Sequence, residues 1–363
     1  MLDLKYSNKL LKLALITLIA CPNIGNAQVL DFDSEAIEQD FVYNLNQYAN
    51  SYIGSELDAY SLNKISLWQT SGKVLQPFAV SLTVQNSVTL LKSAQVRFNF
   101  NDVAFSQNLN IENPSDPELP TVLGGSTEKN LVYSVKESRT GIEHKQSFSA
   151  LSGINSPFNS IPSSSLILGV GLPANTQLYL RFFPTMTVYN VKHFEIGGGV
   201  KHQLSQYFLG EDSPFNISVC VQYNFSKYKH YLDRLLDGND QHIVVKDNII
   251  YGDLAASYDK KWFSLFILAG MYSSETQFNI NGTYSFEVEE TDPVVGVPIV
   301  KEAFSVKNPV SLTTKSINPR ASFGIALKVV HVAELAFAYS IAEYNTVSAN
   351  LTFKFNNKPK KEH

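Results

Sequence analysis

The stretch PFNISVCVQYNFSK, residues 214–227, constrains the fold more than any other part of the chain, because apolar and polar residues alternate through it for about twelve residues. Side chains of a β-strand point alternately to its two faces, so this strand has one apolar and one polar face. A typical soluble strand has roughly 5 to 6 residues, whereas a tilted strand that crosses a bilayer needs roughly 9 to 11. Its apolar residues are aromatic at both ends and aliphatic between them, as expected where a strand meets two membrane interfaces.

Similar alternation recurs along most of the chain beyond Trp68. The clearest segments are 78–84, 96–100, 178–182, 194–200, 321–329, 335–341 and 347–355. With weaker candidates included we expect roughly 12 to 14 strands, and Asn281-Gly282 is a strong two-residue hairpin signal. The sequence therefore predicts an all-β fold, an antiparallel transmembrane β-barrel over residues 67–355, followed by a disordered tail over 356–363.

The composition is consistent with a barrel in a membrane. Charged residues make up 17 % of the chain and aromatic residues 12 %, against roughly 25 % charged in ordinary soluble domains. The mean hydropathy of −0.07 is too polar for a bundle of membrane helices, but it suits barrel strands, in which only every second residue is apolar.

The first 27 residues have the features of a secretory signal peptide. Lys5, Lys9 and Lys12 precede an apolar run over 13–20, and Gly25-Asn26-Ala27 forms a small-x-small cleavage site. A lipoprotein cleavage box ending at Cys21 is an alternative that Pro22 disfavours. Cleavage before Gln28 leaves 26 basic and 32 acidic residues, a formal charge of −6, so we expect no nucleic-acid partner.

One amphipathic helix is expected between the signal peptide and the barrel. Its apolar stripe repeats at helical spacing and consists of Ile37, Phe41, Leu45, Tyr48 and Tyr52. Such a stripe must be buried, either against a membrane surface or in the barrel lumen, and the scarcity of nearby Lys and Arg disfavours the membrane surface. We therefore predict that residues 28–66 form a helical segment that plugs or caps the lumen.

Four charged residues fall on the polar phase of the predicted strands and are expected to face the lumen: Arg97, Arg181, Glu195 and Lys201. Ion pairing is the expected role, because an unpaired charge beside apolar neighbours is costly. In 262–271 both phases are apolar, so part of the lumen is predicted to be apolar, for a plug or a ligand. Gly197-Gly198-Gly199 would permit curvature or close packing against a plug.

The remaining motifs do not predict a cofactor site, a metal site or a catalytic site. Gly169 to Ala174 imitates a dinucleotide fingerprint, but a strand follows instead of the required helix, so a hairpin turn is predicted there. The histidines show no metal-ligand spacing, and no nucleophile and base are paired locally. We expect no catalytic residues, no metal and no cofactor. Residues 101–165 interrupt the strand rhythm and should lie outside the barrel or fold into its lumen.

Three motifs in order, LPTVLGG (119–125), GLPANTQLYLRFFP (171–184) and GVKHQLSQYF (199–208), resemble an uncharacterised domain-of-unknown-function family of secreted β-barrel proteins from Gram-negative bacteria. The resemblance covers the chain from about Phe41 to Phe355 and implies a barrel without assigned catalytic residues. More loosely, the architecture is similar to that of outer-membrane transporters of fatty acids and other hydrophobic compounds, whose N-terminal segment plugs the barrel.

The expected function is passive uptake or binding of a small apolar molecule by a protein of the outer membrane that is not an enzyme. Its expected partners are outer-membrane lipid, that small apolar ligand and, during biogenesis, the barrel-assembly machinery. The alternatives are a non-transporting envelope structural or adhesion barrel, an outer-membrane lipid-modifying enzyme, and a soluble periplasmic lipid-binding sandwich.

Overall fold

The computed structural model describes most of the chain. The described residues are 34–136, 143–154, 158–188, 191–210, 213–232, 239–291, 298–330 and 332–356. The predicted signal peptide, and the predicted tail beyond residue 356, lie outside them.

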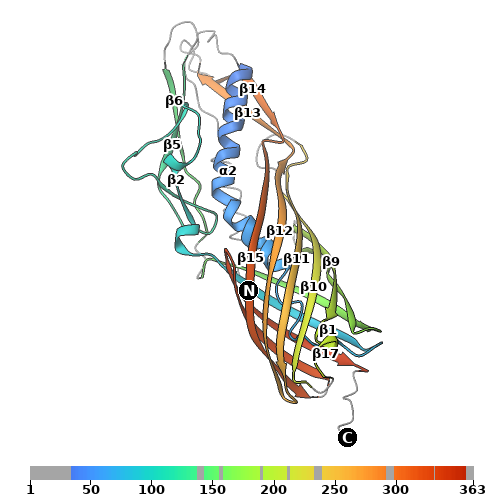
Figure 1. Ribbon diagram of the computed structural model, residues 1–363. Helices are drawn as coiled ribbons and strands as arrows, with labels where there is room; N and C mark the ends of the chain where they lie inside the picture. Colours follow the sequence, from blue (N-terminus) through green and yellow to red (C-terminus); the bar gives the residue numbers. More distant parts are fainter. Residues whose placement is uncertain are drawn as a thin grey trace.

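Ten strands form a closed antiparallel barrel (Figure 1). In order around the barrel they are β1 (Val80–Leu90), β17 (Asn345–Phe355), β16 (Ala333–Ile341), β15 (Val310–Val330), β12 (Phe263–Asn281), β11 (His242–Asp259), β10 (Phe215–Tyr231), β9 (Val191–Gln203), β8 (Thr176–Val188) and β7 (Ser160–Leu172). The barrel closes at β1, where Val84 lies opposite both Leu351 of β17 and Leu166 of β7. This confirms the predicted fold class.

The barrel has fewer strands than the 12 to 14 expected, because other described strands form separate small sheets. These are β2 (Arg97–Asn99) with β4 (Glu118–Pro120); β3 (Leu109–Ile111) with β5 (Asn130–Lys136) and β6 (Glu143–Ser149); and β13 (Thr283–Thr291) with β14 (Pro298–Lys307). Alternation shows that a segment is extended, but it does not show which sheet the segment joins.

The hairpin predicted at Asn281-Gly282 was wrong. Ile280 of β12 pairs with Val310 of β15, and Thr283 of β13 pairs with Lys307 of β14, so β13 continues the course of β12 while β14 leads into β15. Gly282, with φ of +113°, interrupts one long strand pair instead of reversing the chain.

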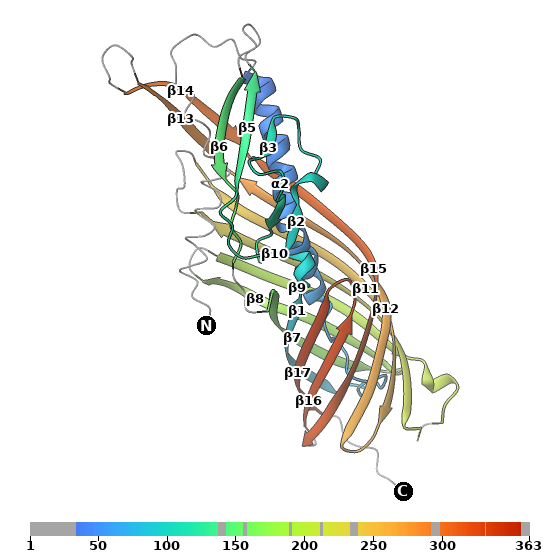
Figure 2. The ribbon, with the colours of Figure 1, turned by 90° about the vertical axis from the view of Figure 1, so that its left-hand side faces the viewer.

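The helix α2 (Ser34–Lys64) runs from beyond the barrel into its lumen (Figure 2). No helix among the described residues is long and apolar enough to cross a membrane. Short 3₁₀ helices cover Ser93–Gln95, Phe100–Asp102 and Ser205–Tyr207. The helix continues through Gly54, and tertiary contacts surround its second half.

The first half of α2 forms hydrogen bonds with the backbone at the start of β15. Asn46 accepts a hydrogen bond from the Ser311 backbone amide at 2.9 Å and donates to the Pro309 carbonyl at 3.0 Å. The β16 pairing of β15 covers only Ala321 to Val330. Over 310–320, β15 therefore has β12 on one side and no described strand on the other, and the Asn46 side chain partners the backbone there. Covering an edge in this way removes a site for unwanted strand pairing.

The two faces of the barrel strands differ sharply in polarity. On β10, Val221 and Tyr223 are about half exposed on the outside, whereas Ser218 and Asn224 are fully buried inside. The outer apolar residues run from Phe215 to Phe225, a length of about 33 Å along the strand, or about 25 Å along the membrane normal at the usual tilt. That height matches the apolar band of a transmembrane β-barrel.

Candidate functional site

The lumen is filled by the end of α2 and the chain that follows it towards β1. Leu62, Ile65, Leu67 and Trp68 are each at most 4 % exposed. We call residues 57–76 the lumenal plug. Charged, polar and apolar wall residues hold the plug in different ways.

A buried ionic triad joins the plug to the wall. Lys64 Nζ lies 2.9 Å from Glu195 Oε2, and Arg181 Nε lies 2.5 Å from Glu195 Oε1. Asn224 also donates to Glu195, at 2.9 Å. Because all three charged groups are buried, removal of the Glu195 carboxylate would leave two buried cations without a counter-charge.

Wall side chains also satisfy the carbonyl groups at the end of α2. Arg181 donates to the carbonyls of Asn63 and Ser66, at 3.2 and 3.4 Å, and Arg320 donates to that of Leu62 at 3.3 Å. The last carbonyls of a helix have no partner within the helix and carry partial negative charge, so cations stabilise them. These arginines therefore cap the helix inside the barrel.

The chain beyond the helix is held by the same kind of contact. Lys201 Nζ donates to the carbonyls of Ser71 and Lys73, at 2.5 and 2.8 Å. Asn350 of the closing strand donates to the carbonyl of Leu67 at 2.8 Å. Strands that are far apart in the sequence, β9 and β17, thus both donate hydrogen bonds to the backbone of residues 67–73.

Two apolar contacts explain features that the sequence left open. A Cβ added at Gly197 would lie 2.9 Å from Trp68 Cη2, and one at Gly199 would lie 3.3 Å from Trp68 Cζ3. The glycines therefore permit close packing of the plug, one of the two predicted roles. Leu67 packs in a cluster with Phe266 and Leu268, which are the inward residues of the doubly apolar segment.

Two buried aspartates complete the polar contacts and were not singled out from the sequence. Asp247 accepts hydrogen bonds from Ser61 of the plug and, at 2.8 Å, from Thr276. Asp253 accepts from Gln69 of the plug. The polar phase of 242–259 could have indicated both, but not their partners.

The structure places the predicted lumenal residues as follows. Arg181, Glu195 and Lys201 are inside the barrel and at most 2 % exposed. Arg97 was predicted wrongly, because it is exposed on β2, which pairs only with β4 outside the barrel. Lys64 was missed as a charged lumenal residue, since helical spacing alone does not show how far into the barrel the helix reaches.

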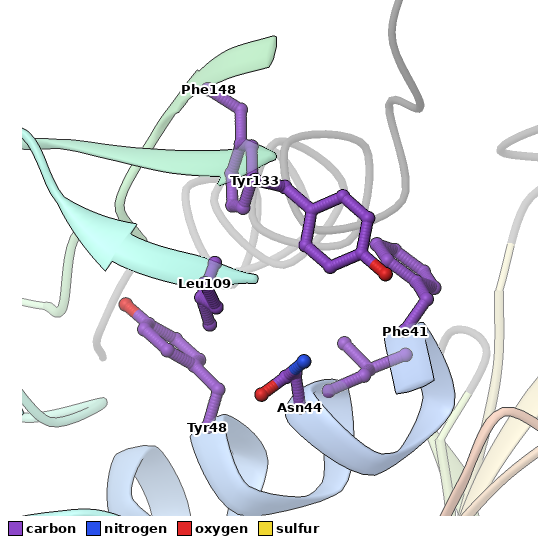
Figure 3. Close-up of a pocket in the computed structure, with 7 residues that line it drawn as sticks. Phe41, Asn44, Tyr48, Leu109, Tyr133 and Phe148 are labelled. Atoms are coloured by element: carbon purple, nitrogen blue, oxygen red, sulfur yellow. The ribbon is translucent and has the colours of Figure 1, made fainter. Parts of the chain in front are cut away.

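Only part of the apolar stripe of α2 contacts the barrel wall as expected. Leu45 packs with Ile280 of β12 and Val310 of β15, near one end of these wall strands, and Phe41 packs against the same cluster. The rest of the stripe is covered by the segment between β1 and β7: Tyr48 packs in a second cluster with Phe100 and Leu109, and Ile37, Phe41 and Tyr52 pack against it (Figure 3). A helix of 31 residues is about 46 Å long at 1.5 Å per residue, so its first half projects beyond the barrel.

These observations define a transmembrane β-barrel whose lumen is closed by its own N-terminal segment. Within the described residues, no group of three or more His, Cys, Asp or Glu could hold a metal ion. The chain belongs to the Family of unknown function (DUF6588), whose model matches residues 6–355. A comparison with curated proteins finds no match.

Solved structures with similarity to the chain are bacterial barrels of low sequence identity. The outer membrane protease OmpT from Escherichia coli is 9 % identical with a TM-score of 0.28, over 80 % of this chain and 100 % of that one. The translocator domain of autotransporter NalP from Neisseria meningitidis is 10 % identical with a TM-score of 0.25, over 91 % and 100 %. Ail, the attachment invasion locus protein of Yersinia pestis, is 6 % identical with a TM-score of 0.25, over 77 % and 100 %.

Proposed function

We propose that this protein is an outer-membrane β-barrel that mediates passive uptake or binding of a small apolar molecule. The lengths of the strand connections at the two ends of the barrel indicate which end would face the periplasm. The longest strand connection at that end is 204–214, and 173–175 and 260–262 are shorter, whereas the long connections 91–159 and 282–309 lie at the other end. In outer-membrane barrels the short turns are periplasmic and the longer loops extracellular, so the outer half of α2 would face the cell exterior.

The observation that carries this proposal is an interruption in the barrel wall between β7 and β8. Their backbone pairing runs from Leu172 with Thr176 to Leu166 with Phe182 and ends there. The other half of β7, over 160–165, pairs only with β1, and the other half of β8 pairs only with β9. Pro162 and Pro184 lie in these two halves, and proline has no amide hydrogen to donate to a neighbouring strand.

We call this interruption the β7–β8 seam. Aromatic side chains and the plug lie beside it. The Tyr60 hydroxyl is 3.5 Å from His193 Nε2 and 3.1 Å from Ser226 Oγ, and the rings of Phe183 and His193 have centroids 4.9 Å apart. A route from the lumen through a barrel wall ends in lipid, which favours an apolar solute over a polar one. The aromatic lining supports the same class of molecule.

Cross-linking the seam tests the proposal. Cysteines at Ser164 and Pro184, in a Cys220→Ser background, would be joined with a bis-maleimide in purified protein reconstituted into liposomes. Uptake of N-phenyl-1-naphthylamine, a fluorescent apolar probe, should fall at least fivefold after cross-linking. The control pair replaces Leu168 and Leu180, which already face each other in the paired half.

The control cross-link should leave uptake unchanged. Equal uptake by both cross-linked pairs, with the barrel demonstrably folded, would contradict passage through the seam. Absence of any uptake above protein-free liposomes in the uncross-linked protein would contradict transport itself.

A second candidate is an adhesion barrel, favoured by the small sheets that project beyond the barrel at the same end as the outer half of α2 (Figure 2). The test is attachment of cells expressing the protein to immobilised host-matrix or bacterial surfaces. Attachment that depends on the protein, combined with no uptake of the apolar probe, would favour this candidate.

A further inference from the structure

Four lysines lie side by side on the outer face of β9, β10 and β11, and we call them the lysine cluster. They are Lys192, Lys227, Lys229 and Lys246. Lys229 of β10 lies directly opposite Lys192 of β9, and Lys227 of β10 lies directly opposite Lys246 of β11. The alternation of burial along each strand places all four on the face that carries the exposed apolar residues.

The lysine cluster is compact. Residues directly opposite each other on antiparallel strands have Cβ atoms about 4.5 to 5.5 Å apart, and Lys227 and Lys229 are separated by about 7 Å along β10. The four side chains therefore start from a patch of about 10 Å by 7 Å. Like charges directly opposite each other on a sheet repel, and this repulsion occurs twice here. A bound anion between the lysines of each pair would remove it.

No carboxylate of the described residues neutralises the lysine cluster, since none of its four ammonium groups forms an ion pair with one. Glu195 of β9 and Asp247 of β11 are close in sequence, but both point into the lumen and are fully buried. Glu275, on the outer face of β12, already pairs with Lys315 at 3.1 Å. The cluster is therefore a patch of uncompensated positive charge on the outer surface.

The lysine cluster lies at the border of the apolar band. Along the outer face of β10, Phe225 is followed by Lys227, Lys229 and finally Tyr231, whose ring centroid is 4.3 Å from Lys229 Nζ. Because β9 and β11 pair directly with β10, their lysines lie at the same level. This end of the barrel also has the long connections and would face the outer leaflet in the orientation proposed above. Lipid headgroups lie at such a border, just beyond the hydrocarbon region.

We propose that the lysine cluster binds the headgroup of an anionic lipid that carries more than one phosphate group, with one phosphate at each opposed lysine pair. Its acyl chains would lie along the apolar outer surface of β9 to β11. Clustered lysines beside a membrane attract anionic lipids in this way. A soluble phosphate ion suits the cluster less well, because salt screens exposed charges in water and the ion gains nothing from the apolar surface. The proposal does not depend on uptake of an apolar molecule.

Native mass spectrometry of the intact protein in detergent tests the site. The probes are the diphosphoryl and monophosphoryl forms of hexa-acylated lipid A, which share their acyl chains and differ by one phosphate group. The wild type should bind the diphosphoryl form at least fivefold more tightly. Lys227→Gln combined with Lys229→Gln removes one lysine of each pair and should weaken binding of the diphosphoryl form by about tenfold or more.

Lys260→Gln combined with Lys261→Gln is the matched control, because it removes the same charge from two exposed lysines at the other end of the barrel. Its binding of the diphosphoryl form should stay within twofold of the wild type. Lys227→Arg combined with Lys229→Arg keeps the positive charge and should retain binding. Heat-dependent gel mobility verifies that each variant is folded.

Equal loss of binding by the two double glutamine variants would overturn the proposal, as would equal binding of the two lipid forms by the wild type. If the first double variant does not fold, Lys192→Gln combined with Lys246→Gln replaces it, since it removes the other lysine of each pair and should give the same loss. Inorganic pyrophosphate at millimolar concentration should not displace the diphosphoryl lipid. Displacement would show that the lysines bind a soluble anion and would overturn the assignment to a lipid.

Discussion

Glu195 shows how much depends on single charges in this lumen. It is fully buried and accepts from Lys64, Arg181 and Asn224. The sequence predicted that Glu195 and Arg181 face the lumen, because the alternating phase assigns each residue of a strand to a face. It could not predict Lys64 as their partner, because 131 residues separate Lys64 from Glu195 and no local pattern relates them.

The substitution Glu195→Gln should destabilise the folded barrel by about 3 to 5 kcal/mol, because it leaves two buried cations without a counter-charge. Urea titration with heat-dependent gel mobility as the readout measures this. Glu143→Gln removes a solvent-exposed pair with Lys145 and is the control, with little expected effect on stability because surface ion pairs contribute little. Similar destabilisation by the two variants would contradict a structural role for the triad.

Glu56 should make the contact between α2 and the 91–159 segment depend on pH. Burial raises the pKa of this carboxyl from 4.5 to about 7, although Thr121 and Leu123 donate hydrogen bonds to it. The folded state therefore holds the proton more tightly than the unfolded state. The contact is most stable below about pH 4.5, weakens as pH rises towards 7, and loses up to about 3 kcal/mol above it.

Limited trypsin cleavage within 91–159 measures this contact. Cleavage should be faster at pH 8 than at pH 5 after correction for trypsin activity on an unstructured peptide. Glu56→Gln should reduce the difference between the two pH values. A pH difference retained in full by Glu56→Gln would show that another group is responsible.

At the scale of the elements, α2 has two halves with different environments. The sequence predicted the helix and the burial of its stripe, but not which surface would cover the stripe. The covering residues come from the ends of the wall strands β11, β12 and β15, and also from β2 to β6 and the pair β13 and β14. The short alternating segments of these small sheets look like barrel strands in the sequence. The first half of α2 projects beyond the barrel because the helix is long. The stripe from Ile37 to Tyr52 indicated a shorter helix than the one that forms, Ser34–Lys64.

The two halves of α2 should respond differently to substitution. Phe41→Asp should loosen the contacts of the first half of α2 and leave single-channel conductance at the wild-type level, because Phe41 lies in the helix about four turns before the plug residues 57–76. Trp68→Ala should raise the conductance, because it removes the ring packed on Gly197 and Gly199. Planar-bilayer recordings of the two variants measure this, and a higher conductance for Phe41→Asp than for Trp68→Ala would contradict the assignment of the plug to residues 57–76.

At the scale of the whole molecule, the outer surface of the barrel is what the sequence predicted best. One alternating strand indicated both faces, because lipid outside and polar groups inside impose a strict period of two. The strand number and the β7–β8 seam were not predictable in this way, because pairing between strands depends on register and not on the pattern within each strand.

A charge on the lipid-facing surface should therefore be costly only within the apolar band. Val221→Lys, near its middle, should reduce the free energy of unfolding by about 2 to 4 kcal/mol, whereas Tyr231→Lys, at the strand end, should cost about 0 to 1 kcal/mol. Unfolding in lipid vesicles measures both. Equal costs would place the bilayer elsewhere on the barrel.

The position of β1 between β7 and β17 has a consequence for how the plug can move. The chain passes through a closed ring: α2 is packed against small sheets at one end, and Ala79 leads directly into the ring wall at the other. Both ends of the plug are therefore anchored to folded parts of the protein, on opposite sides of the barrel. The plug cannot be expelled in either direction while both ends stay folded, so passage through the lumen, as proposed, would require rearrangement of residues 57–76 in place.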